Sequence, residues 1–350
     1  MKKLAVIIPI YNVENFLDEC LLSFVNQTSK DFHTYLIDDG SKDKSGDLAK
    51  KYAEKYPDLF EYHYQENKGL GGARNTGLSL AKEPYVWFFD SDDFTAVKTI
   101  ENIVNYLSNH NPDILMLMPV IYDMQSTSYE DWHDKEIVEC IYQNNNPSIN
   151  VGIEPGLLST ETSVCRSIWR KEFLDKLSFK FEEKVKWEDV YPHFYLFSKA
   201  ESIEYLPILG SYYYRVNTGK QITAGSGKTR LDMIHLFFEV IDLAKKDMWT
   251  SKMYAHLIRT MQNYFLWSLD LSSLRYRKEY VKGMHKVYRK IPCKYFKEYK
   301  NLAEPYSHFK KQHIFADILR NSLSFRLLYN NRFKDFVKRI INKLKKIVKG

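Results

Sequence analysis

The stretch YVWFFDSDD, residues 85–93, runs from five apolar or aromatic residues straight into three aspartates within four positions. Such an apolar run predicts a strand that is buried on both faces. Carboxylates this close repel one another, and burial strengthens the repulsion. We therefore expect a positive group to neutralise Asp90, Asp92 and Asp93, or these acids to lie at the open end of the strand. Mg²⁺ or Mn²⁺ would fit, since hard cations prefer carboxylate oxygens, and a solvated acidic turn is the simpler alternative.

The sequence on either side of this stretch alternates strand and helix patterns. Repeated β-α-β units predict an α/β fold, a Rossmann-like, mostly parallel twisted sheet with flanking helices. Ligands of such sheets bind beyond the carboxyl ends of the strands, and the polar clusters of this chain fall at those ends. The expected strands are 4–10, 34–41, 62–65, 85–93 and 113–119, and the expected helices are 15–27, 45–56, 71–83 and 99–110.

The pattern changes twice further along the chain. Residues 118–155 are polar and rich in Asn, Ser and acids, which predicts long loops with one strand at 136–142. A helix is expected at 167–177 and strand pieces at 202–216. After about Gly225, apolar residues recur at helical spacing along almost the whole remaining chain. We therefore expect an α/β domain over 1–225, with a nucleotide half 1–118 and an acceptor half 119–225, followed by a helical region over 226–350.

Two further polar clusters fall at the end of a predicted strand and the start of a predicted helix. In DDGS, residues 38–41, an acid can accept hydrogen bonds from a nucleobase or a ribose, although Gly40 also suits a plain turn. In GLGGARNTGL, residues 69–78, the glycines permit close backbone approach, and Arg74 adds a cation near a helix N-terminus. A glycine turn with a surface arginine is the alternative for this second cluster.

A third cluster is KWED, residues 186–189. Its carboxylates, Glu188 and Asp189, follow Trp187. A carboxylate against an aromatic wall can acquire a raised pKa and serve as a general base. The alternative is an acidic start to a helix, because carboxylates favour helix N-termini.

Six motifs in this order resemble the inverting family-2 glycosyltransferases, which have a GT-A fold. The resemblance covers residues 4–223 and does not identify the helical remainder. It implies an enzyme that moves a sugar from a nucleotide-sugar donor, with UDP as the expected nucleotide, to a glycan hydroxyl. The motifs are VIIPIYNVENFLDECLLSFVNQT, LIDDGSKDKSGDLAKKY, NKGLGGARNTGL, YVWFFDSDD, WED and YYYRVNTGKQIT.

The resemblance also implies roles for single residues around the donor. Pro9, Tyr11 and Asp39 would line the pocket for the base and ribose, with Tyr11 near the face of the base. Arg74 would help to orient the donor, and Asp90 would face the ribose.

The metal and the general base are implied in the same way. Asp92 would hold a divalent cation, Mn²⁺ or Mg²⁺, on the diphosphate, with Asp93 next to it. Asp189 would be the general base, and Glu188 a neighbour that orients the acceptor.

Two features lie near the expected domain boundary. By the resemblance, Arg215, in a mobile loop near residues 218–223, would close on the pyrophosphate, although this loop departs from the S-I-T that many relatives have. The segment AGSGKTR, residues 224–230, looks like a P-loop, but Ile222 stands where that motif requires glycine. We interpret the segment as a hinge between domains.

The composition indicates where in the cell the protein is expected to work. The chain has 350 residues and a net charge of +7, which suits an anionic surface or ligand. Its four cysteines are scattered without a C-x-x-C pair, which favours a reducing compartment. No apolar stretch approaches the roughly 20 residues that span a bilayer, and the N-terminal apolar run is too short for a signal peptide. We expect a cytoplasmic protein that is peripheral on the inner face of the membrane.

The C-terminal residues 332–350 have one apolar helical face and one basic face, with Asp335 as the only acid. This pattern predicts a helix on an anionic membrane surface, and a docked terminal helix is the alternative. Nucleic-acid binding would explain the same charge, but no nucleic-acid module is recognisable. The tail makes a lipid-linked glycan acceptor in bacterial surface polysaccharide synthesis, such as a capsule, the expected setting. The oligomeric state stays open.

Three alternatives to this function remain. A metal-dependent nucleotidyltransferase would use the same carboxylates to attack phosphorus. A non-catalytic protein could dock on membranes through its tail. A glycosyltransferase that needs no metal would make Asp92 a structural acid.

Overall fold

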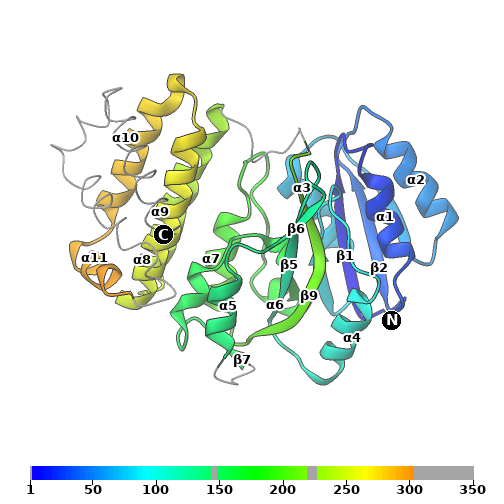
Figure 1. The fold of residues 1–350 in the computed structure, drawn as a ribbon, viewed down its shortest axis with the longest axis horizontal. Coiled ribbons are helices and arrows are strands. Elements are labelled where there is room, and N and C mark those ends of the chain that lie inside the picture. Colours follow the sequence, from blue (N-terminus) through cyan, green and yellow to red (C-terminus); the bar gives the residue numbers. More distant parts are fainter. Residues whose placement is uncertain (1, 144–147, 219–226, 303–350) are drawn as a thin grey trace. The chain divides into compact units, whose positions relative to one another are not determined.

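The computed structural model describes residues 2–143, 148–218 and 227–302. The chain divides into two units, Met1–Ala224 and Gly225–Gly350. The first unit is a sheet with helices packed on it, and the described part of the second unit is helical (Figure 1). The basic segment 332–350 and residues 219–223, which the sequence predicts as part of a mobile loop, lie outside the described residues.

The first unit is built on one nine-stranded sheet, whose N-terminal part is parallel. β1 (Leu4–Ile10) lies between β2 (Phe32–Asp38) and β4 (Tyr85–Phe88), and β3 (Phe60–Tyr64) pairs with β2. β1 is buried along its whole length, which explains why its sequence is a continuous apolar run. The predicted mostly parallel α/β sheet with flanking helices is confirmed.

The rest of the sheet is mixed, because one strand enters it in the opposite direction. β8 (Ser167–Arg170) lies between β4 and β5 (Ile114–Asp123) and is antiparallel to both. β9 (Ile203–Val216) runs parallel to β5. Two short antiparallel strands complete the sheet: β6 (Ser128–Asp131) on β5 and β7 (Ser148–Ile149) on β9.

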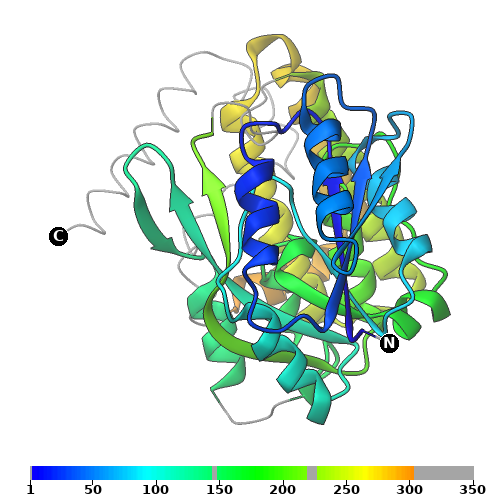
Figure 2. The same cartoon turned by 90° about the vertical axis from the view of Figure 1, so that its right-hand side faces the viewer.

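Helices cover both faces of this sheet. Neighbouring residues of a strand point to opposite faces. Phe24 of α1 contacts the ring of Trp87, which pairs with Val6, whereas Gly77 of α3 lies against Ile7. The two helices therefore lie on opposite faces, and α2 lies beside α1 (Figures 1 and 2, blue). The helices are α1 (Leu17–Val25), α2 (Ser45–Lys55), α3 (Gly69–Leu80), α4 (Thr99–Asn109), α5 (Lys135–Tyr142), α6 (Lys171–Lys176) and α7 (Val190–Lys199), with 3₁₀ turns η1 (Pro155–Ser159) and η2 (Val164–Arg166).

Two predicted elements of this unit are wrong. Residues 136–142 were expected as a strand but form α5. Its buried residues, Ile137 and Val138, are adjacent in the sequence. On a strand they would point to opposite sides, whereas on a helix both can face the same side. The helix expected at 167–177 begins instead as β8 and becomes helical only in α6. The segment 118–155 also contains more regular structure than the loops that its composition predicts.

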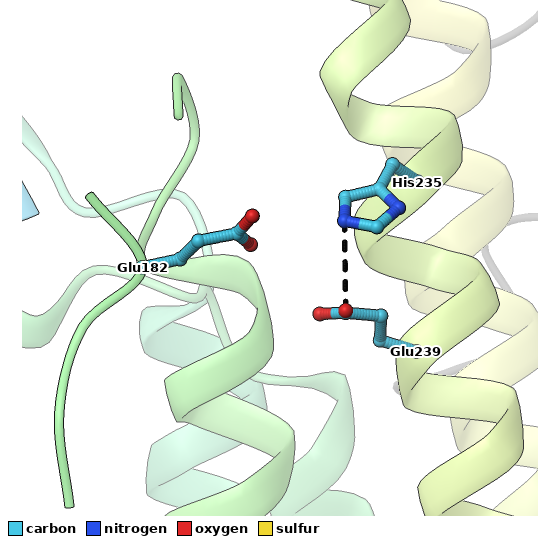
Figure 3. A group of neighbouring side chains, drawn as sticks. All are labelled: Glu182, His235 and Glu239. Atoms are coloured by element: carbon cyan, nitrogen blue, oxygen red, sulfur yellow. Dashed lines mark ion pairs between the residues drawn. The ribbon is translucent and has the colours of Figure 1, made fainter. Parts of the chain in front are cut away.

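The second unit packs its helices around aromatic side chains. Phe265 lies 5.2 Å from Phe237 and 5.7 Å from Tyr288, measured between ring centres. Figure 3 shows an ion pair on the surface of α8, with 3.5 Å between His235 Nε2 and Glu239 Oε1; Glu182, also labelled there, belongs to the first unit. None of the helices in the described part of the chain is both long and apolar enough to cross a lipid bilayer. The elements are η4 (Lys228–Leu231), α8 (Asp232–Lys246), α9 (Ser251–Leu271), α10 (Leu274–Lys290) and α11 (Cys293–Lys300).

Candidate active site

The centre of the site is one buried arginine that contacts three carboxylates. Arg74, on α3, is 1% exposed. Its Nη1 donates to Glu188 Oε1 at 2.7 Å and to Asp189 Oδ1 at 2.5 Å, and its Nη2 donates to Asp90 Oδ1 at 3.0 Å. Asp90 follows β4, whereas the other two carboxylates directly precede α7. Acidic clusters that are far apart in the sequence therefore meet on one guanidinium.

Asp39 holds the start of the helix that carries this arginine. It is 3% exposed. Its Oδ1 accepts from Lys68 N at 2.8 Å and from Gln65 Nε2 at 2.6 Å, and its Oδ2 accepts from Gly69 N at 2.9 Å. A carboxylate is stabilised at a helix N-terminus, where backbone N–H groups lack partners. The acid after β2 thus fixes where α3 begins, and its contact with base and ribose stays a prediction.

The glycines of α3 bring another segment of the chain against this helix. A Cβ on Gly71 would lie 2.3 Å from the carbonyl oxygen of Glu182, and Gly69 has a φ of +79°. Both positions therefore need glycine. The close backbone approach that the sequence predicts is made by the protein's own segment 181–184. That segment leads directly to Glu188 and Asp189.

Burial and charge act in opposite directions on the two acids before α7. Burial and, to a smaller extent, the neighbouring Asp189 raise the pKa of Glu188 to about 7, although Arg74 acts in the opposite direction. Burial likewise raises the pKa of Asp189, which Arg74 lowers and Asp90 raises. The side chain of Asp189 is 22% exposed, against 7% for Glu188. Asp189 is therefore the more accessible of two carboxylates that hold protons more tightly than usual.

A short segment at η2 completes the surroundings of Asp189. Val164 N donates to Asp189 Oδ2 at 3.3 Å, and the Sγ of Cys165 lies 3.6 Å from Arg74 Nη2. Trp87 Nε1 donates to the carbonyl of Cys165 at 2.7 Å. The role of Val164 was not predicted from the sequence, because a backbone N–H of an apolar residue carries no chemical signature.

Arg215 lies in β9, so its expected position in a mobile loop is wrong. It is 1% exposed, and its guanidinium lies 4.6 Å from the ring centre of Phe94. Its backbone N–H donates to Asp93 Oδ1 at 2.8 Å, and its Nη1 donates to the carbonyl of Asp92 at 2.8 Å. Strand β9 therefore holds the D-x-D-D turn in place. Closure of Arg215 on a pyrophosphate stays a prediction.

The aspartates after β4 suit a hard cation. Asp93 is 1% exposed, and its Oδ2 is a buried oxygen with no hydrogen-bond partner among the described residues. Burial and the neighbouring Asp92 raise the pKa of Asp93, and burial and Asp90 raise the pKa of Asp92 to about 6. A buried, unpaired carboxylate oxygen is costly unless a proton or a cation satisfies it. The residues present therefore fit Mg²⁺ or Mn²⁺.

Residues 5–175 match the family Glycosyl transferase family 2. This part of the chain belongs to the family. Among curated relatives, the minor teichoic acid biosynthesis protein GgaB of Bacillus subtilis is 32% identical over 185 residues, which cover 52% of this chain and 19% of that protein. Glycosyltransferase GlyA of Streptococcus pneumoniae is 31% identical over 223 residues, or 62% of this chain and 31% of that protein. The chain thus spans less than a third of either relative.

Solved structures show that this family-2 chain has the GT-A fold. S. aureus TarS 1–349, in complex with UDP-GlcNAc, aligns with a TM-score of 0.72 and 20% sequence identity. The alignment covers 93% of this chain and 90% of that structure. The sequence-based recognition of the family and its fold is therefore confirmed.

The remaining predicted donor residues of this family-2 protein lie at the carboxyl end of β1. Pro9 is inside the strand, paired in register with Ile37. Tyr11, just beyond it, is 48% exposed. The side chain of Asn12 accepts from Lys42 N at 2.8 Å, which ties the end of β1 to the turn after β2. An exposed ring at this edge can stack on a nucleobase, and that role stays a prediction.

Proposed function

We propose that this protein is an inverting glycosyltransferase that moves a sugar from a UDP-sugar to a glycan hydroxyl. Membership of the family supports the reaction class. TarS, which has the same fold, has been solved with UDP-GlcNAc, and this supports UDP as the nucleotide. The observation that carries the proposal is the contact of Asp90, Glu188 and Asp189 with Arg74, because it joins acids of both halves of the domain in one site.

In this proposal Asp189 is the general base. Its greater exposure makes it the carboxylate that an acceptor hydroxyl can reach. Burial raises its pKa toward the range in which a base works near neutral pH, and Arg74 limits the rise. Asp189 takes the proton of the acceptor hydroxyl while that oxygen attacks the anomeric carbon. The bond to the diphosphate breaks on the opposite face, so one displacement inverts the configuration and no covalent nucleophile is needed.

The donor would lie at the carboxyl ends of β1, β2 and β4. Pro9, Tyr11 and Asp39 would flank the base and ribose, as the family resemblance implies. Asp92 and Asp93 would hold Mn²⁺ or Mg²⁺ there. When bound, such an ion stabilises the negative charge that the leaving nucleoside diphosphate gains.

We assign Arg74 to the base rather than to the donor. Its described polar contacts are with Glu188, Asp189, Asp90 and Cys165, and only 1% of its surface is exposed. Glu188, on the same Nη1, would keep the guanidinium in register with Asp189. A residue that acts in this way positions the base and sets its pKa.

For the acceptor we propose a lipid-linked oligosaccharide in bacterial surface polysaccharide synthesis, at the inner face of the membrane. The relative named for teichoic acid biosynthesis supports this setting, and so does the basic, amphipathic pattern of residues 332–350. Deletion of 332–350 should abolish co-sedimentation with liposomes that contain anionic lipid. Unchanged co-sedimentation would end the membrane proposal and leave the chemistry untouched.

The decisive experiment combines a donor screen with one substitution. A panel of nucleotide sugars is first tested for hydrolysis in the presence of Mn²⁺. Asp189→Asn should then lower the rate with the best donor by about 10²–10⁴-fold, while calorimetry shows unchanged donor binding. Asp175→Asn is the matched control, because the side chain of Asp175 is 57% exposed and pairs with Lys171 on the surface of α6.

The outcomes separate the alternatives. Full activity in Asp189→Asn would refute the assigned base. Release of a nucleoside diphosphate identifies sugar transfer, whereas attack on phosphorus by a nucleotidyltransferase releases a different product. No turnover with any donor would favour a non-catalytic protein.

A further inference from the structure

Asp189 is held from two sides, and the second side is a backbone group. Its Oδ1 accepts from Arg74, and its Oδ2 accepts from Val164 N at 3.3 Å. Val164 is the first residue of the short turn η2, which contains only three residues. A turn this short does not fix its own position, so the donor N–H needs an external anchor.

Trp87 and Trp169 bond the carbonyls of Cys165 and Val164, and a charged anchor, a buried ion pair, lies at the other end of the turn. Arg166, the last residue of η2, is 1% exposed, and its Nη1 donates to Asp134 Oδ2. The same oxygen accepts from Glu161 N at 2.6 Å. Asp134 is 5% exposed, and its own carbonyl accepts from Val138 N at 3.1 Å in the first turn of α5. One carboxylate therefore ties both ends of segment 161–166 to a helix.

We propose that Asp134 and Arg166 are positioning residues for the general base, acting through the backbone N–H of Val164. This inference rests on the proposed function, since it concerns how Asp189 is aimed. Neither residue touches Asp189. They hold segment 161–166, whose Val164 N–H contacts Asp189. Cys165 in the same segment contacts Arg74, which binds the other oxygen of the base.

The chain contains a matched ion pair that lacks the link to Asp189. Asp113 is 2% exposed, and its Oδ1 accepts from Arg170 Nη2 at the far end of β8. Its Oδ2 accepts from Glu201 N at 2.7 Å, just as Asp134 accepts from Glu161 N. Each aspartate thus binds one arginine and the backbone of a neighbouring segment, through one N–H at Asp134 and through two at Asp113, which also accepts from Ser202 N at 3.3 Å.

Loss of the hydrogen bond from Val164 should change the pKa of Asp189 in a definite direction. The groups that face Asp189 are Arg74 on α3, Asp90 after β4, Cys165 in η2 and Glu188 on its own segment. A hydrogen bond to the ionised form lowers a carboxyl pKa, so loss of the Val164 bond raises the pKa of Asp189. The acid limb of the pH–rate profile should therefore move to higher pH, by up to about one unit.

The test compares Asp134→Asn with Asp113→Asn, both assayed below their measured unfolding temperatures. Asp134→Asn should move the acid limb upward and lower the plateau of kcat about 10–100-fold, with KM for the donor unchanged, because a small misplacement of a catalytic group is costly. Asp113→Asn should lose thermal stability and leave the acid limb where it is.

A third variant probes the contact directly. Val164→Pro removes the N–H, and proline suits the first position of a 3₁₀ turn after Ser163, whose ψ is 120°. Val164→Ala keeps the N–H and serves as its control. We expect a lower kcat for the proline variant than for the alanine variant.

The result that overturns the proposal is equal loss of activity in Asp134→Asn and Asp113→Asn with unmoved acid limbs, because that pattern is a general loss of stability. Equal kcat in Val164→Pro and Val164→Ala would overturn it as well. Failure of the proposed function itself looks different: in that case Asp189→Asn keeps its activity, or the wild type transfers no sugar.

Discussion

Replacing Arg74 with methionine should move the pH at which the enzyme becomes active. Methionine fills a similar buried volume but removes the charge, so Glu188 and Asp189 lose the cation that their pKa values depend on. Both carboxylates then hold their protons to higher pH. A protonated Asp189 cannot accept the proton of the acceptor, so transfer at neutral pH falls and returns in alkaline buffer.

The size of the effect follows from the geometry of the contacts. Arg74 Nη1 lies 2.7 Å from Glu188 Oε1 and 2.5 Å from Asp189 Oδ1. For charge centres about 4 Å apart at an effective dielectric constant of about 20, Coulomb's law gives about 4 kcal/mol. That energy raises the carboxyl pKa by about three at most, and measured arginine–carboxylate pairs change the pKa of the acid by about 1–3. Below the new midpoint, kcat should fall about tenfold each time the pH is lowered by one.

The assay is a pH–rate profile of sugar transfer at saturating donor, for the wild type, Arg74→Met and Arg74→Lys. The lysine variant keeps the charge without the planar fork that reaches three carboxylates, so its midpoint should lie between the other two. The reasoning would be refuted if Arg74→Met lowered the maximal kcat and raised the KM for the donor, while the midpoint of the pH–rate profile stayed where it is in the wild type. That result would restore Arg74 to the donor-orienting role that the sequence resemblance implies.

Three further predictions concern stability and the metal. Burial and the neighbouring Asp189 together raise the pKa of Glu188 from 4.5 to about 7. Its contribution to stability is therefore present below pH 4.5 and is lost as the pH rises through 7, by up to about 3 kcal/mol. Urea unfolding at pH 5 and pH 8 should show this difference in the wild type and a smaller one in Glu188→Gln. Gly71→Ala should destabilise by about 1–3 kcal/mol because its Cβ would meet a backbone oxygen at 2.3 Å, whereas Gly227→Ala, with nothing within 4 Å, should leave the melting temperature unchanged. EDTA should abolish transfer and Mn²⁺ restore it, with Asp92→Asn needing more Mn²⁺ for half-maximal rate; activity that persists in EDTA would remove Asp92 from the metal site.

The parallel part of the fold could be predicted from the sequence because its signals are local. A strand buried on both faces needs a continuous apolar run, as in residues 4–10, and a helix on the sheet needs apolar residues at helical spacing. The acids at 90–93 were correctly expected after a buried strand, since an apolar run cannot continue through three carboxylates. Each of these inferences uses residues that are neighbours in the sequence.

The errors arise where partners distant in the sequence decide the structure. The sequence of residues 167–177 predicts a helix, yet residues 167–170 form a strand. They do so because Ile168 and Trp169 pair with β4 on one side and with β5 on the other. The position of Arg215 was wrong for a similar reason: after two register shifts, β9 pairs again with β5 from Tyr213 to Val216, and this pairing includes Arg215. The contact of Val164 with Asp189 uses a backbone group, and no side-chain pattern could have indicated it.

Among the residues that the structure describes, the acids of the site outnumber the arginines that contact them. Five carboxylates face two arginines, and one of those arginines, Arg215, also pairs with Glu19 at 2.7 Å. Arg74 already contacts Asp90, Glu188 and Asp189, and Arg215 cannot by itself balance the other two acids of the D-x-D-D turn. A nucleoside diphosphate adds further negative charge at the same strand ends, where like charges cost most because water is scarce. The donor and a divalent cation should therefore each raise the affinity of the protein for the other, by the same factor. The affinity for the donor should fall sharply in EDTA. The affinity for a neutral glycan acceptor should not change. The carboxylates in this comparison are Asp90, Asp92, Asp93, Glu188 and Asp189.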